Sequence, residues 1–153
     1  MKTNAVRILE SAKIEFQTYE YAFDENALDA VSVAKKINAE PEQVFKTLVS
    51  KSENIYLVFC IPGNYELNLK KAAATAEVKK IEMLPLKELT NVTGYIRGGC
   101  SPVGMKKLFP TYIDETALLF DMIYVSAGVR GMQLYIKPND LATVIGAKFA
   151  DLI

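Results

Sequence analysis

Six of the eight glycines in this chain of 153 residues lie between positions 94 and 131. Short segments rich in β-branched and aromatic residues separate them, a pattern typical of short strands joined by tight turns. These segments cover positions 95–96, 112–113, 118–125 and 132–136. A doubly wound dinucleotide fold is disfavoured, because its strands alternate regularly with long helices.

The rest of the chain predicts short helices and one β-hairpin. Helices are expected near 6–12, 30–37, 69–76, 86–90 and 141–145, with starts marked by Thr3 or Asn4, Asp29, Asn68, Pro85 and the run Pro138-Asn139-Asp140. Positions 16–23 favour a strand, and the apolar runs 44–50 and 55–61, joined by the polar loop 51–54, predict a hairpin. We therefore expect one α/β domain over residues 1–153, with short helices around a mixed, largely antiparallel or barrel-like sheet.

The chain contains no histidine, which excludes Ser-His-Asp and Cys-His nucleophile pairs and histidine-ligated zinc. Two cysteines, Cys60 and Cys100, are too few for a cysteine-rich metal site, so we expect neither a metal nor a cofactor. Eighteen basic and eighteen acidic residues give no net charge, which argues against a polyanion binder held by bulk charge. No apolar run is long enough for a membrane span and the start lacks a signal peptide, so a cytoplasmic protein is expected.

Lys46 is the first candidate for chemistry. In the strand predicted over 44–50, the two-residue period places Lys46 on the face that carries Val44 and Leu48, while Thr47 lies on the other face. A lysine on an apolar strand face is either a guard at a sheet edge or a cation in a pocket. In a pocket it would hold an anionic or developing anionic group. The pattern alone favours the edge position, because edge lysines are common.

Two glycine-rich segments, 94–104 and 125–131, are the second candidates. Backbone N–H groups freed by such glycines can hold a carbonyl oxygen or a phosphate, although a plain structural turn explains the same residues. The segment 94–104 lacks the spacing of a phosphate loop. Ser126 and Cys100 lack a histidine to activate them, so neither is expected to act as a nucleophile.

Four basic residues flank these segments: Arg97, Lys106, Lys107 and Arg130. If the two segments meet in space, the four would form a basic rim for a phosphate backbone, and otherwise they are ordinary surface charges. Tyr19 and Tyr21 would lie on one face of their strand, at the edge of the core or in a pocket.

Taken together, these segments resemble the YbaK/EbsC family of aminoacyl-tRNA deacylases, which is related to the editing insertion of bacterial prolyl-tRNA synthetases. The matching segments are 44–49, 94–104, 109–114, 125–131 and 147–151. The resemblance spans essentially the whole chain and is greatest to the cysteinyl-tRNA(Pro) deacylase branch.

The resemblance implies the editing-domain fold and a trans-editing reaction on Cys-tRNA(Pro), with Cys-tRNA(Cys) as a further substrate. In the implied mechanism the substrate's own thiol attacks its ester carbonyl, so the enzyme supplies only positioning and charge stabilisation. The implied partners are tRNA(Pro) and prolyl-tRNA synthetase. Two alternatives stay open: specificity for alanine or serine, and a non-catalytic module that binds tRNA or the synthetase.

The resemblance also implies roles for single residues. Lys46 matches the family's essential lysine, with Thr47 beside it, and Ser126 matches a pocket serine. The loop that faces the aminoacyl ester is matched by Gly98, Gly99, Cys100, Ser101 and Pro102. The pocket tyrosine corresponds to Tyr21, with Tyr19 as the other candidate. Some relatives have an aspartate near Gln133, where this chain is neutral.

Overall fold

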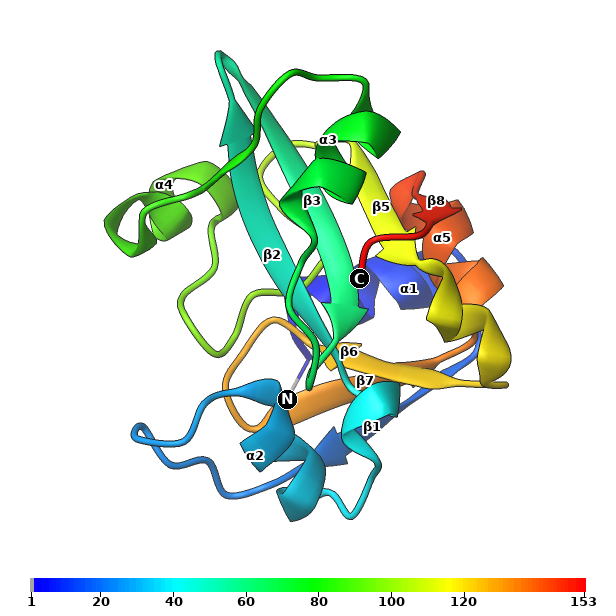
Figure 1. Ribbon diagram of the computed structural model, residues 1–153. Helices are drawn as coiled ribbons and strands as arrows, with labels where there is room; N and C mark the ends of the chain where they lie inside the picture. Colours follow the sequence, from blue (N-terminus) through cyan, green and yellow to red (C-terminus); the bar gives the residue numbers. More distant parts are fainter. Residues whose placement is uncertain (1) are drawn as a thin grey trace.

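The predicted hairpin is the longest pair of strands in the molecule. The computed structural model, which describes residues 2–153, pairs β2 (Phe45–Ser52) with β3 (Ile55–Pro62) in antiparallel register (Figure 1). Lys46 lies opposite Ile61 and Thr47 opposite Cys60. The hairpin is the centre of a five-stranded sheet of order β4-β2-β3-β5-β8, completed by β4 (Glu82–Met83), β5 (Thr111–Asp114) and β8 (Lys148–Ala150).

A second sheet has three strands in the order β1-β7-β6. Its members are β1 (Phe16–Glu20), β7 (Met132–Ile136) and β6 (Ile123–Ser126), all antiparallel to their neighbours. An isolated bridge between Val44 and Tyr124 joins the two sheets just before β2 begins. Only the pairs β3-β5 and β5-β8 are parallel among the described strands, so the expectation of a mixed, largely antiparallel α/β domain is confirmed.

Short helices surround the sheets, as the sequence predicts. They are α1 (Asn4–Ser11), α2 (Ala30–Lys36), α3 (Leu69–Ala76), α4 (Leu89–Thr93) and α5 (Pro138–Ile145), with 3-10 turns at Pro41–Gln43, Leu86–Glu88 and Glu115–Leu119. The side chains of Thr3, Asp29 and Asn68 cap α1, α2 and α3 by accepting a backbone N–H three residues on.

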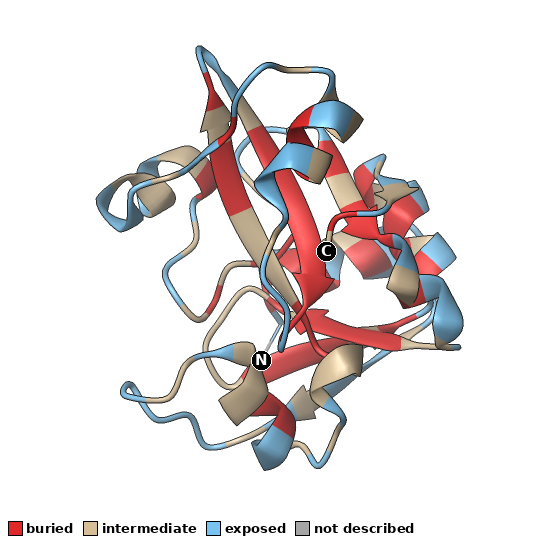
Figure 2. Ribbon diagram, in the orientation of Figure 1, coloured by how far each residue is buried: buried red, intermediate tan, exposed pale blue. Residues whose placement is uncertain are grey.

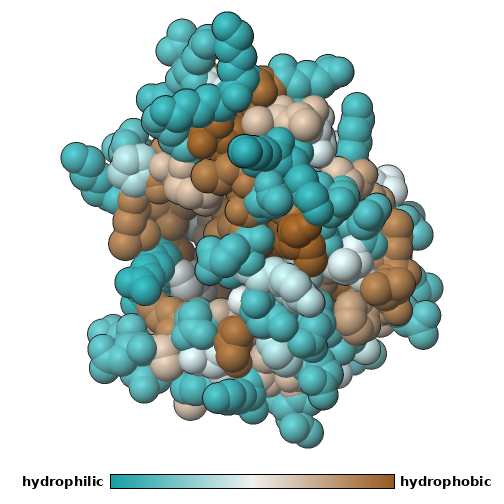
Figure 3. Space-filling view, in the orientation of Figure 1, coloured by the Kyte–Doolittle hydropathy of each residue, from teal (hydrophilic) through white to brown (hydrophobic). Residues whose placement is uncertain are grey.

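The main core fills the space between α1, α5 and the two sheets, and a smaller cluster lies between α3 and the hairpin. Figure 2 shows the consequence, with buried residues along the sheet strands and exposed residues on the helices and turns. In the view of Figure 3, hydrophilic side chains cover much of the surface, with apolar patches between them. Within residues 2–153, no helix is both long and apolar enough to cross a membrane.

Two local expectations were wrong, and two short strands were not predicted. Residues 95–96 form no strand, because they lie in the irregular loop that follows α4. The segment 118–125 is divided, since its first part belongs to a 3-10 turn and strand β6 begins only at Ile123. The short strands β4 and β8 have no counterpart in the prediction, because both are defined by pairing with distant strands rather than by a local pattern.

Candidate active site

A cavity of about 270 Å³ opens where the two sheets, α2 and the glycine-rich segment 94–104 meet. The fourteen residues that line it come from six parts of the chain: Leu28, Asp29, Ala30, Val33, Val44, Phe45, Lys46, Thr47, Gly63, Arg97, Gly98, Cys100, Ser126 and Gln133. Six of the residues that the sequence marked as candidates are among them, so residues far apart in the chain converge on one site.

Lys46 is half-buried and lines this cavity. Of the two positions that the sequence pattern allowed, a sheet edge or a pocket, it therefore occupies the pocket. Its Nζ donates a hydrogen bond to the carbonyl oxygen of Gly63, 3.3 Å away. Only part of the ammonium's donor capacity is used by this bond, because a lysine carries three N–H groups. The remaining donors are available to an anionic group in the cavity.

One wall of the cavity was not predicted from the sequence. Leu28 packs against Gly98, where an added β-carbon would lie 3.1 Å from the Leu28 side chain. Ala30 packs against Gly63, where an added β-carbon would lie 2.6 Å from the Ala30 Cβ. The segment 28–30 therefore joins the glycine-rich loop to the end of β3, and both glycines are needed for this approach. The only local signal for this segment is the helix cap at Asp29.

The two glycine-rich segments meet in space, as the basic-rim hypothesis required. Arg130 Nε donates to the carbonyl oxygen of Arg97 at 2.9 Å. Gly99 lies against the same segment, because a β-carbon there would come within 3.1 Å of the Arg130 nitrogen. Arg97 and Arg130 are thus neighbours, and Arg97 lies in the cavity lining.

The second half of the ester-facing loop turns away from this cavity. Ser101 is fully buried, and its hydroxyl accepts the Val103 N–H at 3.1 Å. Pro102 lines a different, smaller hollow beside Ile8. Gly98 and Cys100 therefore face the site, whereas Ser101 and Pro102 hold the loop's shape.

Cys100 contributes an un-ionised thiol to the cavity. Burial raises its pKa from an ordinary 9.0 to about 11, although a hydrogen bond with Thr93 works in the opposite direction. Cys60, fully buried behind Thr47, has its pKa raised to about 12 by the same desolvation. Neither cysteine is a thiolate near neutral pH, in agreement with the absence of a base to activate it.

Ser126 and Gln133 form the opposite wall on β6 and β7, where they are cross-strand partners. The Ser126 hydroxyl accepts the Gly128 N–H at 3.2 Å and keeps its own proton to donate. Gln133 is buried and lines the cavity, and its side-chain amide is of a type that can both donate and accept hydrogen bonds.

The two candidate tyrosines lie outside the lining. Tyr19 is part of an aromatic cluster, with ring centroids 5.4 Å from Tyr124 and 5.5 Å from Tyr135. Tyr21 is half-buried, and its backbone N–H donates to the Gly131 carbonyl oxygen at 2.9 Å. Its backbone thus lies against the segment that carries Ser126.

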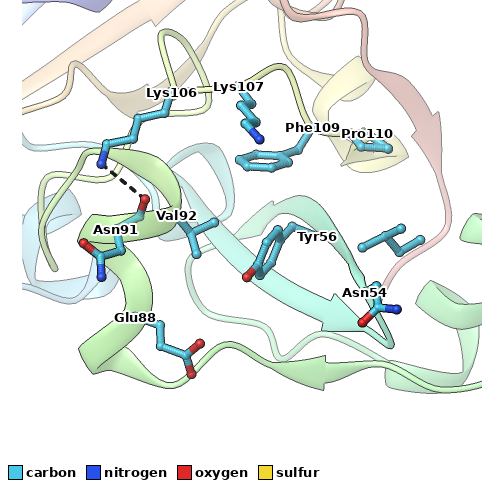
Figure 4. A pocket seen from close by; sticks show the side chains of 10 residues that line it. Asn54, Tyr56, Glu88, Asn91, Val92, Lys106, Lys107, Phe109 and Pro110 are labelled. Carbon is cyan, nitrogen blue, oxygen red and sulfur yellow. Dashed lines mark hydrogen bonds between the residues drawn. The ribbon is translucent and has the colours of Figure 1, made fainter.

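Lys106 and Lys107 line a second, larger cavity of about 640 Å³, between α4 and the hairpin (Figure 4). The rings of Tyr56 and Phe109 meet edge to face there at 5.6 Å. Lys106 Nζ donates to the Asn91 carbonyl oxygen at 3.2 Å, which holds it at the rim. The four predicted basic residues are therefore divided into two pairs, one at each cavity.

The candidate site can bind and polarise but has no activated nucleophile. Lys46, the Ser126 hydroxyl and backbone N–H groups are hydrogen-bond donors suited to a carbonyl oxygen or a phosphate. No group of three or more metal-ligating side chains occurs among residues 2–153. Chemistry at this site must therefore draw its nucleophile from water or from the substrate.

Comparison with known proteins agrees with this description. A family model described as the aminoacyl-tRNA editing domain matches residues 24–144. The "Putative Cys-tRNA(Pro)/Cys-tRNA(Cys) deacylase EbsC" of Enterococcus faecalis is 48% identical over 152 residues, which cover 99% of this chain and 93% of that protein. Proline–tRNA ligase of Staphylococcus haemolyticus is 29% identical over 114 residues, or 74% of this chain but only 20% of the ligase.

Solved structures show the same fold. A crystal structure of "a putative trans-editing enzyme for prolyl tRNA synthetase" superposes with a TM-score of 0.82 at 24% identity, covering 99% of this chain and 98% of that one. The hypothetical protein APE2540 gives a TM-score of 0.87 at 20% identity, with 95% and 96% covered. From the family match and the identity to EbsC, we conclude that this chain belongs to the aminoacyl-tRNA editing domain family.

Proposed function

We propose that this protein is a trans-editing deacylase that removes cysteine from mischarged tRNA(Pro), with Cys-tRNA(Cys) as a further substrate. The observation that carries the proposal is Lys46, a cation with free donors in a cavity that holds no activated nucleophile. The family match and the name of the Enterococcus relative support the same substrate class.

In the proposed reaction, the substrate's thiol sulfur attacks its own ester carbonyl. A carbon–sulfur bond forms, the ester carbon–oxygen bond breaks, and the thiol proton passes to the 3′ or 2′ oxygen of the terminal ribose. The products are free tRNA and a cyclic thiolactone of cysteine. Lys46 stabilises the negative charge that develops on the carbonyl oxygen, and backbone N–H groups of the loop around Gly98 orient it.

The remaining candidate residues have distinct proposed roles. Thr47, Cys100 and Ser126 contact the aminoacyl group from the cavity wall, whereas Gly99, Ser101 and Pro102 keep the loop in place. Of the two tyrosines, Tyr21 is the proposed substrate contact, because Tyr19 is occupied by its aromatic cluster.

For tRNA binding, we propose that Arg97 and Arg130 contact the phosphates next to the terminal adenosine. Lys106 and Lys107 contact a more distant part of the RNA, with the Tyr56 and Phe109 rings beside them. Base stacking on aromatic rings and lysine contacts to phosphates commonly occur together in such surfaces. Because the net charge is zero, prolyl-tRNA synthetase is the proposed partner that strengthens this weak binding.

We further propose that residues 1–153 act as one editing unit in the cytoplasm, where tRNAs are charged. The test is deacylation of Cys-tRNA(Pro) by the wild-type protein and by Lys46→Ala, with Ala-tRNA(Pro) and Ser-tRNA(Pro) as controls. Loss of cysteine that needs Lys46 supports the proposal. Loss of alanine or serine instead would contradict the thiol mechanism, and tRNA binding without any cleavage would indicate a binding module.

A further inference from the structure

Three charged residues line the candidate site, and their signs differ. Lys46 and Arg97 are cations. Among the described residues 2–153, Asp29 is the only carboxylate in the lining. Gln133, on the opposite wall, is neutral. A ligand with one positive and one negative centre would match this arrangement better than a simple anion would.

Packing contacts bring Asp29 to the Lys46 side of the cavity. The Lys46 ammonium donates to the Gly63 carbonyl, and Gly63 lies directly against Ala30, the neighbour of Asp29. Leu28, on the other side of Asp29, packs on Gly98 of the ester-facing loop. Asp29 is therefore held between the lysine and the loop, by packing on both sides.

The Asp29 carboxylate is ionised and still has capacity to accept. Hydrogen bonds from the Ser32 hydroxyl (2.6 Å) and the Ser32 N–H (3.1 Å), one to each oxygen, lower its pKa. A carboxylate has about four acceptor sites, so each oxygen retains a free lone pair. The residue is exposed, and a cation entering the cavity can reach it.

We infer that Asp29 binds the α-ammonium group of the aminoacyl ester and so restricts the enzyme to substrates with a free amino group. This inference rests on the proposed function and adds a requirement to it. The α-ammonium is the one positive charge of an aminoacyl-adenosine end. The phosphate carries the negative charge that Arg97 matches, and negative charge develops on the ester carbonyl oxygen, which Lys46 matches, as the bond to sulfur forms. A charge-assisted hydrogen bond from the ammonium to Asp29 would also orient the ester carbonyl toward Lys46.

The inference separates two classes of tRNA. Aminoacyl-tRNA carries the α-ammonium, whereas peptidyl-tRNA and N-formylated tRNA carry a neutral amide at the same atom. A neutral amide has no positive charge to pair with Asp29. The carboxylate would lose water to it without gaining a counter-charge, so the blocked esters are rejected.

The experiment compares Cys-tRNA(Pro) with N-acetyl-Cys-tRNA(Pro), which keeps the thiol but lacks the charge. Each rate is divided by the spontaneous hydrolysis rate of the same ester, because acetylation also changes its intrinsic reactivity. The variant is Asp29→Asn, which keeps the cap of α2, since asparagine caps helices as well as aspartate does. The matched control is Asp24→Asn, a carboxylate outside the lining that makes a similar turn, accepting the Asn26 N–H at 2.9 Å.

We expect the wild type and Asp24→Asn to favour the free amine, and Asp29→Asn to lose about 10- to 100-fold of kcat/KM on Cys-tRNA(Pro). The kcat/KM of the same variant on the acetylated ester should change little, so its preference for the free amine is lost. Thermal unfolding of Asp29→Asn should match the wild type, which separates charge loss from helix loss. Equal losses on both esters, or none on either, would overturn the role of Asp29 while leaving the deacylase in place. A wild type inert toward both esters would overturn the proposed function as well.

Discussion

Gly63 and Ala30 approach so closely that a β-carbon on Gly63 would lie 2.6 Å from the β-carbon of Ala30. The same added atom would lie 2.9 Å from the carbonyl oxygen of Val44, the residue just before β2. Because the Gly63 carbonyl also accepts the Lys46 ammonium, one glycine sets both the position of the lysine and the distance to the α2 wall.

Gly63→Ala should therefore impair the site more than its size suggests. The methyl group must displace α2 or the start of β2, so we expect a loss of about 1–3 kcal/mol in the free energy of unfolding. Deacylation per folded molecule should also fall, because the wall moves away from Lys46. Gly146→Ala is the control: nothing lies within 4 Å of its added β-carbon, and its φ of +65° alone destabilises. That variant should lose stability but keep its rate.

Lys46→Ala should lower kcat/KM for Cys-tRNA(Pro) by about 10²–10³-fold, the usual effect of removing a donor to a developing oxyanion. Its thermal unfolding should stay near that of the wild type, because the described partner of the ammonium is one carbonyl. Lys70→Ala, on the exposed side of α3, is the matched control and should behave as wild type in both measurements. A Lys46→Ala enzyme with an unchanged rate would remove the lysine from the mechanism.

Cys100→Ala should deacylate Cys-tRNA(Pro) within about threefold of the wild-type rate, because a thiol with a pKa of about 11 is not the nucleophile. Alkylation of Cys100 by iodoacetamide should be slow at pH 7 and should accelerate toward pH 11, since deprotonation generates the reactive form. Mass spectrometry of the labelled protein follows this directly. A loss of activity beyond tenfold, with the fold intact, would show that Cys100 does more than line the cavity.

Stability should fall at alkaline pH because of Cys60. Burial raises the pKa of this thiol from 9.0 to about 12, so between those values the unfolded chain releases a proton that the folded chain retains. The stabilisation is complete below pH 9 and is lost as pH rises toward 12, by up to about 1.4 kcal/mol per pH unit for one group. Urea unfolding from pH 8 to 11 measures this. The free energy of unfolding of Cys60→Ala should fall less steeply with pH than that of the wild type, although it is lower at pH 8. Identical slopes for both proteins would contradict this origin.

Lys107→Ala should weaken tRNA binding without changing the ester-cleavage step. We expect KM for Cys-tRNA(Pro) to rise by about three- to tenfold and the salt dependence of binding to become shallower, because one phosphate contact is lost. Deacylation of the small ester cysteinyl-adenosine, which has no upstream nucleotides, should be unchanged. Lys79→Ala, another exposed lysine, serves as control. An equal defect on the small ester would indicate a structural role for Lys107.

Features written in the local sequence could be predicted. The hairpin follows from two apolar runs around a polar loop, and the caps at Thr3 and Asn68 follow from residue type and position. Lys46 could be identified as a candidate, but its place in a cavity depends on Gly63 and α2, which local pattern does not connect.

Features made by distant contacts could not be predicted. The wall at Leu28 exists only because Gly98, seventy positions later, leaves room for it. Lys106 follows the ester-facing loop closely in sequence, yet its backbone N–H donates to the Thr93 carbonyl and its side chain lies at the other cavity. Adjacency along the chain was a poor guide there, because the loop reverses between the two points.

The pairing of β1 with β7 gives the two walls of the site very different separations along the chain. The hairpin that carries Lys46 needs only neighbouring residues, so it can form within microseconds of collapse. The wall that carries Ser126 and Gln133 is anchored to the start of the chain, where the Thr3 hydroxyl donates to the Ala127 carbonyl across 124 positions. Closing so long a loop is entropically costly and slow. The contacts that dock this wall beside Lys46 therefore account for most of the loop-closure cost of the cavity.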